Sequence, residues 1–452
     1  MMKRLFNGRL AFLCLILVHV QTINAQEGID TDKLDTFFTE LLDYEKFMGS
    51  VVIIQGDDII FQNAYGFVDE DQTPAHTNHI YRIGSITKSY TAALILMLQE
   101  EGKLNLSDTI ETTYPEIPNA DKITIEQLLR HKSGLFNFTN SPVYSEYYEQ
   151  DVSKQEMIDR FIEYGTNFEP GEDFEYSNTG YVLLGYILED ILEMDFNDIL
   201  RTYITEPLGL NRTYVSERVS AESGEVHSFT YGQGWNLAPQ TNMYIPHAAG
   251  AISSTPLEVA HFYQHLFSGD LLSEESMEQM VELQDNFGLG VFKIPFYDKT
   301  AWGHNGGIDG FQSSAGYFKD EDVAFALLGN GSNYSINEIL IGMLSVTFGV
   351  DFDIPDFEAM AETIELSEEE MEAYTGTFSS EMFPMDIEIF IQNGNLMAQA
   401  TGQGAFPLTV NSHTVMSFEP AGIVLEFDEL RGHKYRAMEL RQAGQQFRFS
   451  LD

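Results

Sequence analysis

The chain has 452 residues, of which 70 are acidic and 24 are Lys or Arg, so its formal net charge is −46 at pH 7. A surface this acidic repels nucleic acid and anionic membranes, which excludes both as expected partners. The single cysteine excludes an internal disulfide, and the length exceeds what one ordinary hydrophobic core needs.

The first 25 residues have the parts of a secretory signal peptide. Lys3 and Arg4 precede an apolar run at residues 10–20, and Ala25 stands at the expected cleavage position. The apolar run is too short to span a membrane comfortably. We therefore expect a secreted or periplasmic protein that has no membrane association after the signal is removed.

The segment after the signal begins with a predicted β-hairpin. Apolar runs at residues 49–55 and 59–61 flank a Gly-Asp-Asp turn. From Ser85 to about residue 280 the pattern is mostly helical. The sequence therefore predicts a strand pair followed by a long helical segment.

A Ser-x-x-Lys pair stands where the helical segment begins. A helix is expected to start at Ser85, because Gly84 precedes it and no Gly or Pro follows until Gly102. Positions i and i+3 share a helix face, so the amine of Lys88 can reach the serine hydroxyl. A serine becomes a good nucleophile when an adjacent base takes its proton. The alternative is a solvated lysine, but the apolar run at residues 92–98 indicates a largely buried helix, where an unpaired charge is costly.

Two further polar motifs follow at a distance. Tyr176 and Asn178 lie just before an apolar helical pattern, with Ser177 or Asn178 as the expected helix cap. Capping and core packing are the alternative roles for these residues. Much later, His304 opens a glycine-rich run between strand-like segments, where glycines permit close backbone approach to a ligand or form a simple turn.

The remaining chain predicts more strands and a second unit. Strands are expected at residues 287–292, 311–318 and 323–328, and a helix at 336–348. The acidic, Pro-containing segment 351–369 is a predicted linker. Short alternating runs in residues 370–452 predict a small antiparallel β-barrel or sandwich. The expected domains are thus residues 26–350 and 370–452.

The three motifs together resemble the β-lactamase-related serine hydrolases, a family that includes class C β-lactamases, D-alanyl-D-alanine carboxypeptidases and esterase-like proteins of the penicillin-binding-protein fold. They are Ser85-x-x-Lys88, Tyr176-x-Asn178 and His304-x-Gly306, and the resemblance extends over about residues 35–348. It implies an α/β fold with an all-helical region: an antiparallel sheet flanked by helices, with the site between the two parts.

The resemblance also implies roles for individual residues. Ser85 would be the nucleophile of an acyl-enzyme, and Lys88 and Tyr176 would share the proton transfers, with the principal base left open. The backbone N–H groups of Ser85 and Gly307 would form the oxyanion hole. The expected substrate-binding residues are Asn178, His304, Asn305 and Gly306. No cofactor or metal is indicated, because no His-Glu-x-x-His motif is present and the histidines are scattered.

The expected activity is that of a secreted serine hydrolase on an ester, an amide or a small, possibly D-residue, peptide. Relatives that act on penicillins usually carry Thr or Ser after the Lys or His of the third motif, whereas this chain has Asn305. His304 would be at most partly charged at neutral pH, since the reference pKa of His is about 6.5. A β-lactamase or D-alanyl-D-alanine carboxypeptidase is the alternative, and a non-catalytic penicillin-binding or sensor protein is the second alternative. The expected partner is a small-molecule or peptide substrate, and the sequence predicts no oligomeric state.

Overall fold

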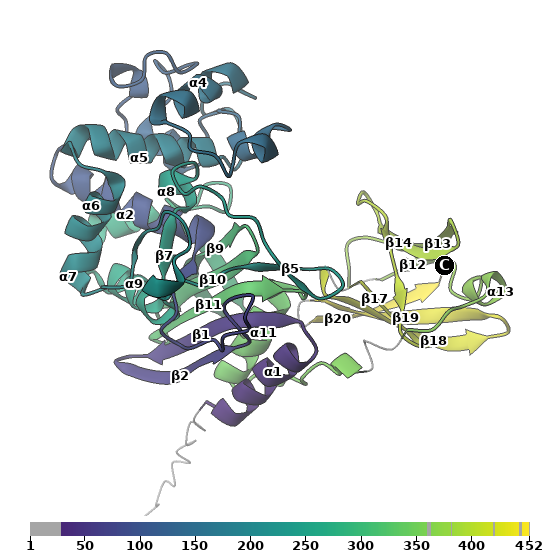
Figure 1. Cartoon of the computed structure of the whole chain (residues 1–452). Coiled ribbons are helices and arrows are strands. Elements are labelled where there is room, and N and C mark those ends of the chain that lie inside the picture. Colours follow the sequence, from purple (N-terminus) through teal and green to yellow (C-terminus); the bar gives the residue numbers. More distant parts are fainter. Residues whose placement is uncertain (1–28, 359–362, 381, 419–420, 443–444, 452) are drawn as a thin grey trace, which may run out of the picture.

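The computed structural model describes residues 29–358, 363–380, 382–418, 421–442 and 445–451, so the predicted signal peptide lies outside the described residues. Figure 1 shows a sheet with helices on both faces, a helical region beside it, and a second sheet built from the end of the chain. No helix of the described residues is both long and apolar enough to cross a membrane.

The central sheet has six antiparallel strands in the order β2-β1-β11-β10-β9-β8. Their bounds are β1 Phe47–Gln55, β2 Asp58–Tyr65, β8 Phe292–Phe296, β9 Lys299–Ile308, β10 Phe311–Phe318 and β11 Val323–Ser332. Val51 of β1 lies opposite Leu327 of β11, so the N-terminal hairpin joins strands from much later in the chain. The hairpin and the strands predicted at residues 311–318 and 323–328 are therefore confirmed.

One sequence prediction for this sheet was wrong. The strand expected at residues 287–292 forms only isolated bridges before β8 begins at Phe292. A Cβ at Gly288 would lie 2.2 Å from the carbonyl oxygen of Met280, so the chain here packs against a helix end and not along a strand. Of the two interpretations of the glycine-rich run, the simple turn is excluded, because the run lies inside β9, where its glycines allow close contact between backbones.

The two faces of the sheet bury alternate residues of β1. Val51 and Ile53 belong to one hydrophobic cluster, and Val52 and Ile54 belong to the other, as the two-residue period of a strand requires. The first cluster is covered by α1 (Thr31–Asp43) and α11 (Ile336–Thr347). The second is covered by α2 (Thr87–Glu100) and α9 (Pro256–Ser268), so the predicted helix at residues 336–348 is confirmed on the face opposite α2 (Figure 1).

The helical region is a single insertion between β2 and β8. Its α-helices are α2 Thr87–Glu100, α3 Ile125–Leu129, α4 Lys154–Tyr164, α5 Asn178–Leu192, α6 Phe196–Leu200, α7 Glu206–Leu208, α8 His247–Gly250, α9 Pro256–Ser268 and α10 Glu274–Val281. Its other turns are η1 Gly84–Ile86, η2 Ile110–Thr112, η3 Phe138–Asn140, η4 Tyr144–Glu146, η6 Ala221–Ser223 and the π-helical η5 Arg201–Thr205. Two small sheets join it, formed by β3 Tyr81–Arg82, β7 Ile252–Ser254 and β4 Tyr214–Val215, and by β5 Phe229–Tyr231 and β6 Trp235–Leu237.

The end of the chain forms a nine-stranded antiparallel sheet that is nearly closed like a barrel, in the order β15-β14-β13-β12-β20-β19-β18-β17-β16. Its elements are α13 Glu368–Met371, β12 Gly376–Ser379, β13 Ile387–Gln392, β14 Asn395–Ala400, β15 Phe406–Pro407, β16 Thr409–Val410, β17 Val415–Phe418, β18 Ile423–Arg431, β19 Lys434–Gln442 and β20 Gln445–Leu451. The sheet has its own hydrophobic cluster. Within the predicted linker, Phe352 and Phe357 pack on the first domain, whereas Ile364 and Leu366 pack on the C-terminal sheet.

Candidate active site

The chain turns sharply just before Ser85. The 3₁₀ turn η1 contains Ser85 and leads directly into α2 at Thr87, so the helix expected at the serine is preceded by one tighter turn. Gly84 has φ of +53°, a conformation that other residues adopt only with strain. A Cβ at Gly84 would also lie 2.8 Å from the amide nitrogen of Gly307. Glycine at this position therefore brings the backbone of β9 beside the serine.

Lys88 contacts Ser85 from one helical turn away. Its Nζ lies 3.1 Å from Ser85 Oγ, 2.8 Å from Asn178 Oδ1 and 2.7 Å from the carbonyl oxygen of Ala249. The Asn178 and Ala249 oxygens can only accept hydrogen bonds. A neutral amine has two N–H groups for these two acceptors, which would leave its lone pair to accept the proton of the serine hydroxyl. The arrangement suits a lysine that acts as a base.

Burial favours the neutral form of this lysine. The side chain of Lys88 is fully buried, and desolvation holds its pKa well below the ordinary value. Its Nζ lies 4.9 Å from the ring centroid of Tyr176 and 5.4 Å from that of Tyr181. The acidic surface of the protein would raise this pKa, but the groups that surround the amine are uncharged.

Asn178 is held in one orientation by the loop before it. Its Nδ2 donates to Asn137 Oδ1 at 3.2 Å and to Thr139 Oγ1 at 3.1 Å, which turns its Oδ1 toward Lys88. Ser177 occupies the N-cap position of α5, as expected, but it makes no capping hydrogen bond, because its hydroxyl donates instead to the carbonyl oxygen of Leu135. The placement gives Asn178 a role in orienting the lysine.

Tyr176 lies between Lys88 and a histidine that the sequence analysis did not single out. Burial raises the pKa of the Tyr176 hydroxyl, and a hydrogen bond with Ser85 opposes that effect. The ring of His131 lies 4.4 Å from the ring of Tyr176, and its Nδ1 accepts from the Ser177 N–H at 3.2 Å. Burial and nearby Lys88 keep the pKa of His131 well below its usual value, so the imidazole is neutral. The His-Lys-Ser-Gly run at residues 131–134 was the available signal, but nothing local in it points to Tyr176.

The third motif is only partly in the site. His304 is buried, and burial together with Lys88 lowers its pKa to about 3. Asn305 Oδ1 accepts from Ser314 Oγ at 2.8 Å, and Asn305 lines a separate hollow beside α11. A Cβ at Gly306 would lie 2.0 Å from the carbonyl oxygen of Ile83, so this glycine is a packing requirement. Of the motif and the glycine that follows it, Gly307 alone lines the cavity that contains Ser85.

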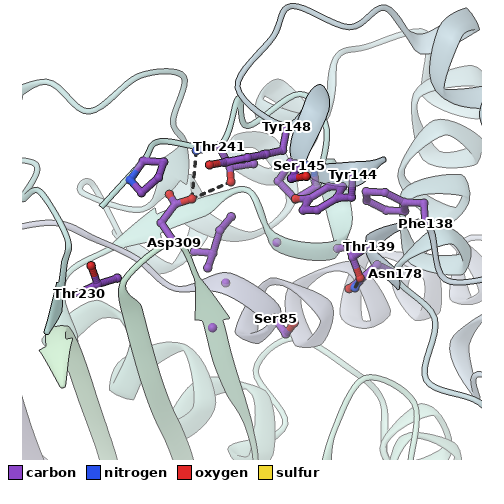
Figure 2. A pocket seen from close by; sticks show the side chains of 17 residues that line it. Ser85, Phe138, Thr139, Tyr144, Ser145, Tyr148, Asn178, Thr230, Thr241 and Asp309 are labelled. Atoms are coloured by element: carbon purple, nitrogen blue, oxygen red, sulfur yellow. Dashed lines mark hydrogen bonds between the residues drawn. The ribbon is translucent and has the colours of Figure 1, made fainter. Parts of the chain in front are cut away.

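That cavity has a volume of about 430 Å³ and lies between η1, the end of β9 and the loops of the helical region (Figure 2). Its wall is largely apolar and aromatic. Besides Ser85, Gly307 and Asn178, the side chains that line it include Phe138, Thr139, Tyr144, Ser145, Tyr148, Thr230, Pro239, Thr241, Pro246, Ile308 and Asp309. Asp309 is the one charged side chain among the lining residues, and it is paired with Arg82 at 2.8 Å.

Comparisons with known proteins agree with this geometry. The β-lactamase family profile matches residues 34–337. Penicillin-binding protein 4* of Bacillus subtilis is 26% identical over 423 residues, which cover 87% of this chain and 93% of that protein. The D-amino acid amidase of Ochrobactrum anthropi SV3, solved with D-phenylalanine, superposes with a TM-score of 0.62 at 25% identity over 71% of this chain and 99% of its own. An octameric penicillin-binding protein homologue from Pyrococcus abyssi matches 93% of this chain and 99% of its own with a TM-score of 0.64 at 23% identity, a likeness of fold.

Proposed function

This chain belongs to the β-lactamase family, and from that premise we propose that it is a serine hydrolase that works through an acyl-enzyme on Ser85. One observation carries the proposal: the buried Lys88 amine lies 3.1 Å from the serine hydroxyl, and its other two partners accept hydrogen bonds. A base in this position can take the proton as the serine attacks a carbonyl carbon.

The proposed reaction has two balanced steps. In the first, Ser85 Oγ forms a bond to the carbonyl carbon as its proton passes to Lys88; the bond from that carbon to the leaving alcohol or amine breaks as the leaving group takes a proton from Tyr176, and the Lys88 proton then restores the Tyr176 hydroxyl. In the second, water attacks the ester carbon and gives a proton to the Lys88 amine; the bond to Ser85 Oγ breaks, the acid is released, and that proton passes to Ser85 Oγ. The neutral Lys88 amine is the proposed principal base, and the Tyr176 hydroxyl is the proposed donor to the leaving group, since its raised pKa keeps it protonated at neutral pH.

The proposed oxyanion hole consists of the backbone N–H groups of Ser85 and Gly307. The close approach of Gly84 to Gly307 supports this assignment. Both donors lie at the cavity that would hold the scissile carbonyl. Removal of one such donor typically costs about a hundredfold to a thousandfold in rate.

The proposed substrate is an ester, an amide or a small peptide, including peptides with a D-residue, whose acyl part carries no free carboxylate near the scissile bond. The lining residues include no Lys, Arg or charged His that could bind such a carboxylate. Similarity to a D-amino acid amidase over nearly its whole length supports the amide class. Similarity to a penicillin-binding protein makes β-lactams and D-alanyl-D-alanine peptides the second candidate class. We also propose export of the protein, on the strength of its first 25 residues.

The test is covalent labelling with a fluorophosphonate probe, located by peptide mass spectrometry. Ser85→Ala should abolish labelling. Ser89→Ala is the matched control four residues further on, in α2, because Ser89 donates to the Gly290 carbonyl oxygen and lies off the cavity wall. Labelling of the Ser85→Ala protein at the wild-type rate would contradict the proposal. Rates for p-nitrophenyl esters, D-amino-acid amides and nitrocefin then rank the substrate classes, and nitrocefin well above the others would overturn the preference.

A further inference from the structure

A buried ion pair stands beside the proposed oxyanion hole and takes no part in the proton transfers. Arg82 Nη1 donates to Asp309 Oδ2 at 2.8 Å, and both side chains are only 2% exposed. Two buried charges cost free energy unless each is fully paired. The small stabilisation that a surface ion pair gives therefore does not explain why these two charges are buried.

The other contacts of the pair join it to two further segments of the chain, at Glu217 and Thr241. Arg82 also donates to the carbonyl oxygens of Thr241 and Glu217, each at 3.0 Å. Asp309 Oδ1 accepts from the Thr241 N–H at 3.0 Å and from Thr241 Oγ1 at 2.6 Å, as the dashed lines in Figure 2 show. Since both carboxylate oxygens have protein donors, Asp309 lines the cavity without offering a free anion to a substrate amine.

The position of the pair along the chain connects it to the two amides of the hole. Arg82 stands three residues before Ser85, and Asp309 stands two residues after Gly307. Asp309 forms the tight β9–β10 turn with φ of +53°, and the next amide, of Gly310, donates to Ser228 Oγ at 3.1 Å. The end of β9 is thus fixed from both sides.

We propose that Arg82 and Asp309 are positioning residues that set the distance between the amides of Ser85 and Gly307, so that both can donate to one oxyanion. The inference rests on the proposed function. An oxyanion hole works only if its donors are already in place when charge develops, and a misplacement of about 1 Å can cost roughly a hundredfold in rate. The ion pair links the segment just before η1, the turn that carries Ser85, to the end of β9, and this link would supply that precision.

The experiment compares three changes with one control. Arg82→Lys keeps the charge but loses the planar fork that serves three acceptors at once. Asp309→Asn leaves the guanidinium without its counter-ion, and Arg82→Met/Asp309→Leu removes both charges together, which avoids a lone buried charge. Glu258→Gln is the control. Like Asp309, the Glu258 carboxylate accepts from a backbone N–H, that of Arg212, and from a threonine hydroxyl, that of Thr213, but Glu258 lies off the cavity wall.

The readouts are thermal unfolding, the rate of fluorophosphonate labelling at Ser85, and kcat and KM for a p-nitrophenyl ester. We expect Arg82→Lys and the double variant to label about tenfold to a hundredfold more slowly, with kcat reduced and KM little changed. Glu258→Gln should lose stability but label at the wild-type rate. Folded variants that label as fast as the wild type would overturn the inference and leave the proposed function standing. A wild-type protein that is not labelled at Ser85 would overturn both.

Discussion

The two parts of the molecule differ in what they bury. The first domain buries several ionisable side chains: Arg82, Lys88, His131 and His304 near the turn that carries Ser85, and Lys46, Arg130, Glu225 and His247 elsewhere. Among the described residues of the C-terminal sheet, the buried polar side chains are only Asn411 and Ser417. Its ion pairs lie at the surface: Arg448 and Asp428, for example, are each nearly half exposed.

This difference indicates that the catalytic groups belong to the first domain and not to the C-terminal sheet. Exposed ion pairs contribute little to stability, commonly about 0–1 kcal/mol. Buried ionisable groups are expensive, and groups whose pKa is strongly perturbed gather at functional sites. We therefore expect every residue that takes part in the reaction to come from the first domain.

The largest expected effect is that of Lys88→Met. The change removes the proposed base but keeps the length of a buried side chain, so kcat should fall by about a hundredfold to ten-thousandfold while the protein stays folded. Ester hydrolysis and thermal unfolding measure the two effects. Lys154→Met is the control, because that lysine pairs with Glu189 and Asp190 in a partly exposed position. A near-normal kcat for Lys88→Met would contradict the role of this buried lysine as the base.

Tyr176→Phe should have a smaller effect, a loss of about tenfold to a hundredfold in kcat. The ring would keep its contact with His131, whereas the proposed proton donor would be lost. The loss should be greater for amides than for p-nitrophenyl esters, because a poor leaving group needs the proton more. Equal losses of kcat for Tyr176→Phe and Lys88→Met on both substrates would show that Lys88 and Tyr176 act together as the base, and that Lys88 is not the base alone.

A smaller effect is expected in the pH dependence of stability. The pKa of Lys88 is lower in the folded than in the unfolded chain, so between these two values the unfolded state binds more protons. The contribution of Lys88 to stability therefore rises with pH, until the unfolded lysine also loses its proton near about pH 10.4. Relative to Lys88→Met, the wild type should gain stability between pH 7 and pH 10 in thermal unfolding. A constant difference would show that Lys88 keeps its proton.

The smallest expected effect on chemistry is that of removing the C-terminal sheet. Phe352 and Phe357 pack on the first domain, so a chain that ends at Glu358 keeps these contacts. This protein should fold and label at Ser85 at about the wild-type rate, since domains with their own cores can fold alone. Labelling rate and circular dichroism are the measurements. Loss of labelling in a folded truncated chain would show that the C-terminal sheet contributes to the site.

Local pattern predicted much of this structure. The apolar run after Lys88 predicted a buried helix, an apolar run predicted β1, strand-like segments predicted β10 and β11, and short alternating runs predicted the strands of the C-terminal sheet. The domain boundaries and residue roles inferred from the sequence stay predictions. What local pattern missed depends on contacts between distant residues. The Asp309 partner of Arg82 is 227 positions away, and the direction of the Asn305 side chain depends on the register of β9 with β10. No short stretch of sequence contains the information that determines this pairing or this register.

The glycines around the start of α2 have a consequence for how this protein can change over generations. Cβ atoms at Gly306 and Gly290 would meet the carbonyl oxygens of Ile83 and Lys88 at 2.0 and 2.6 Å. Backbone atoms therefore enclose η1, the turn that carries Ser85. Their position does not depend on the side chains at the protein surface. Substitutions on the exterior can accumulate toward a net charge of −46 without disturbing that enclosure. Selection for an acidic exterior and selection for the reaction can thus act on separate sets of positions.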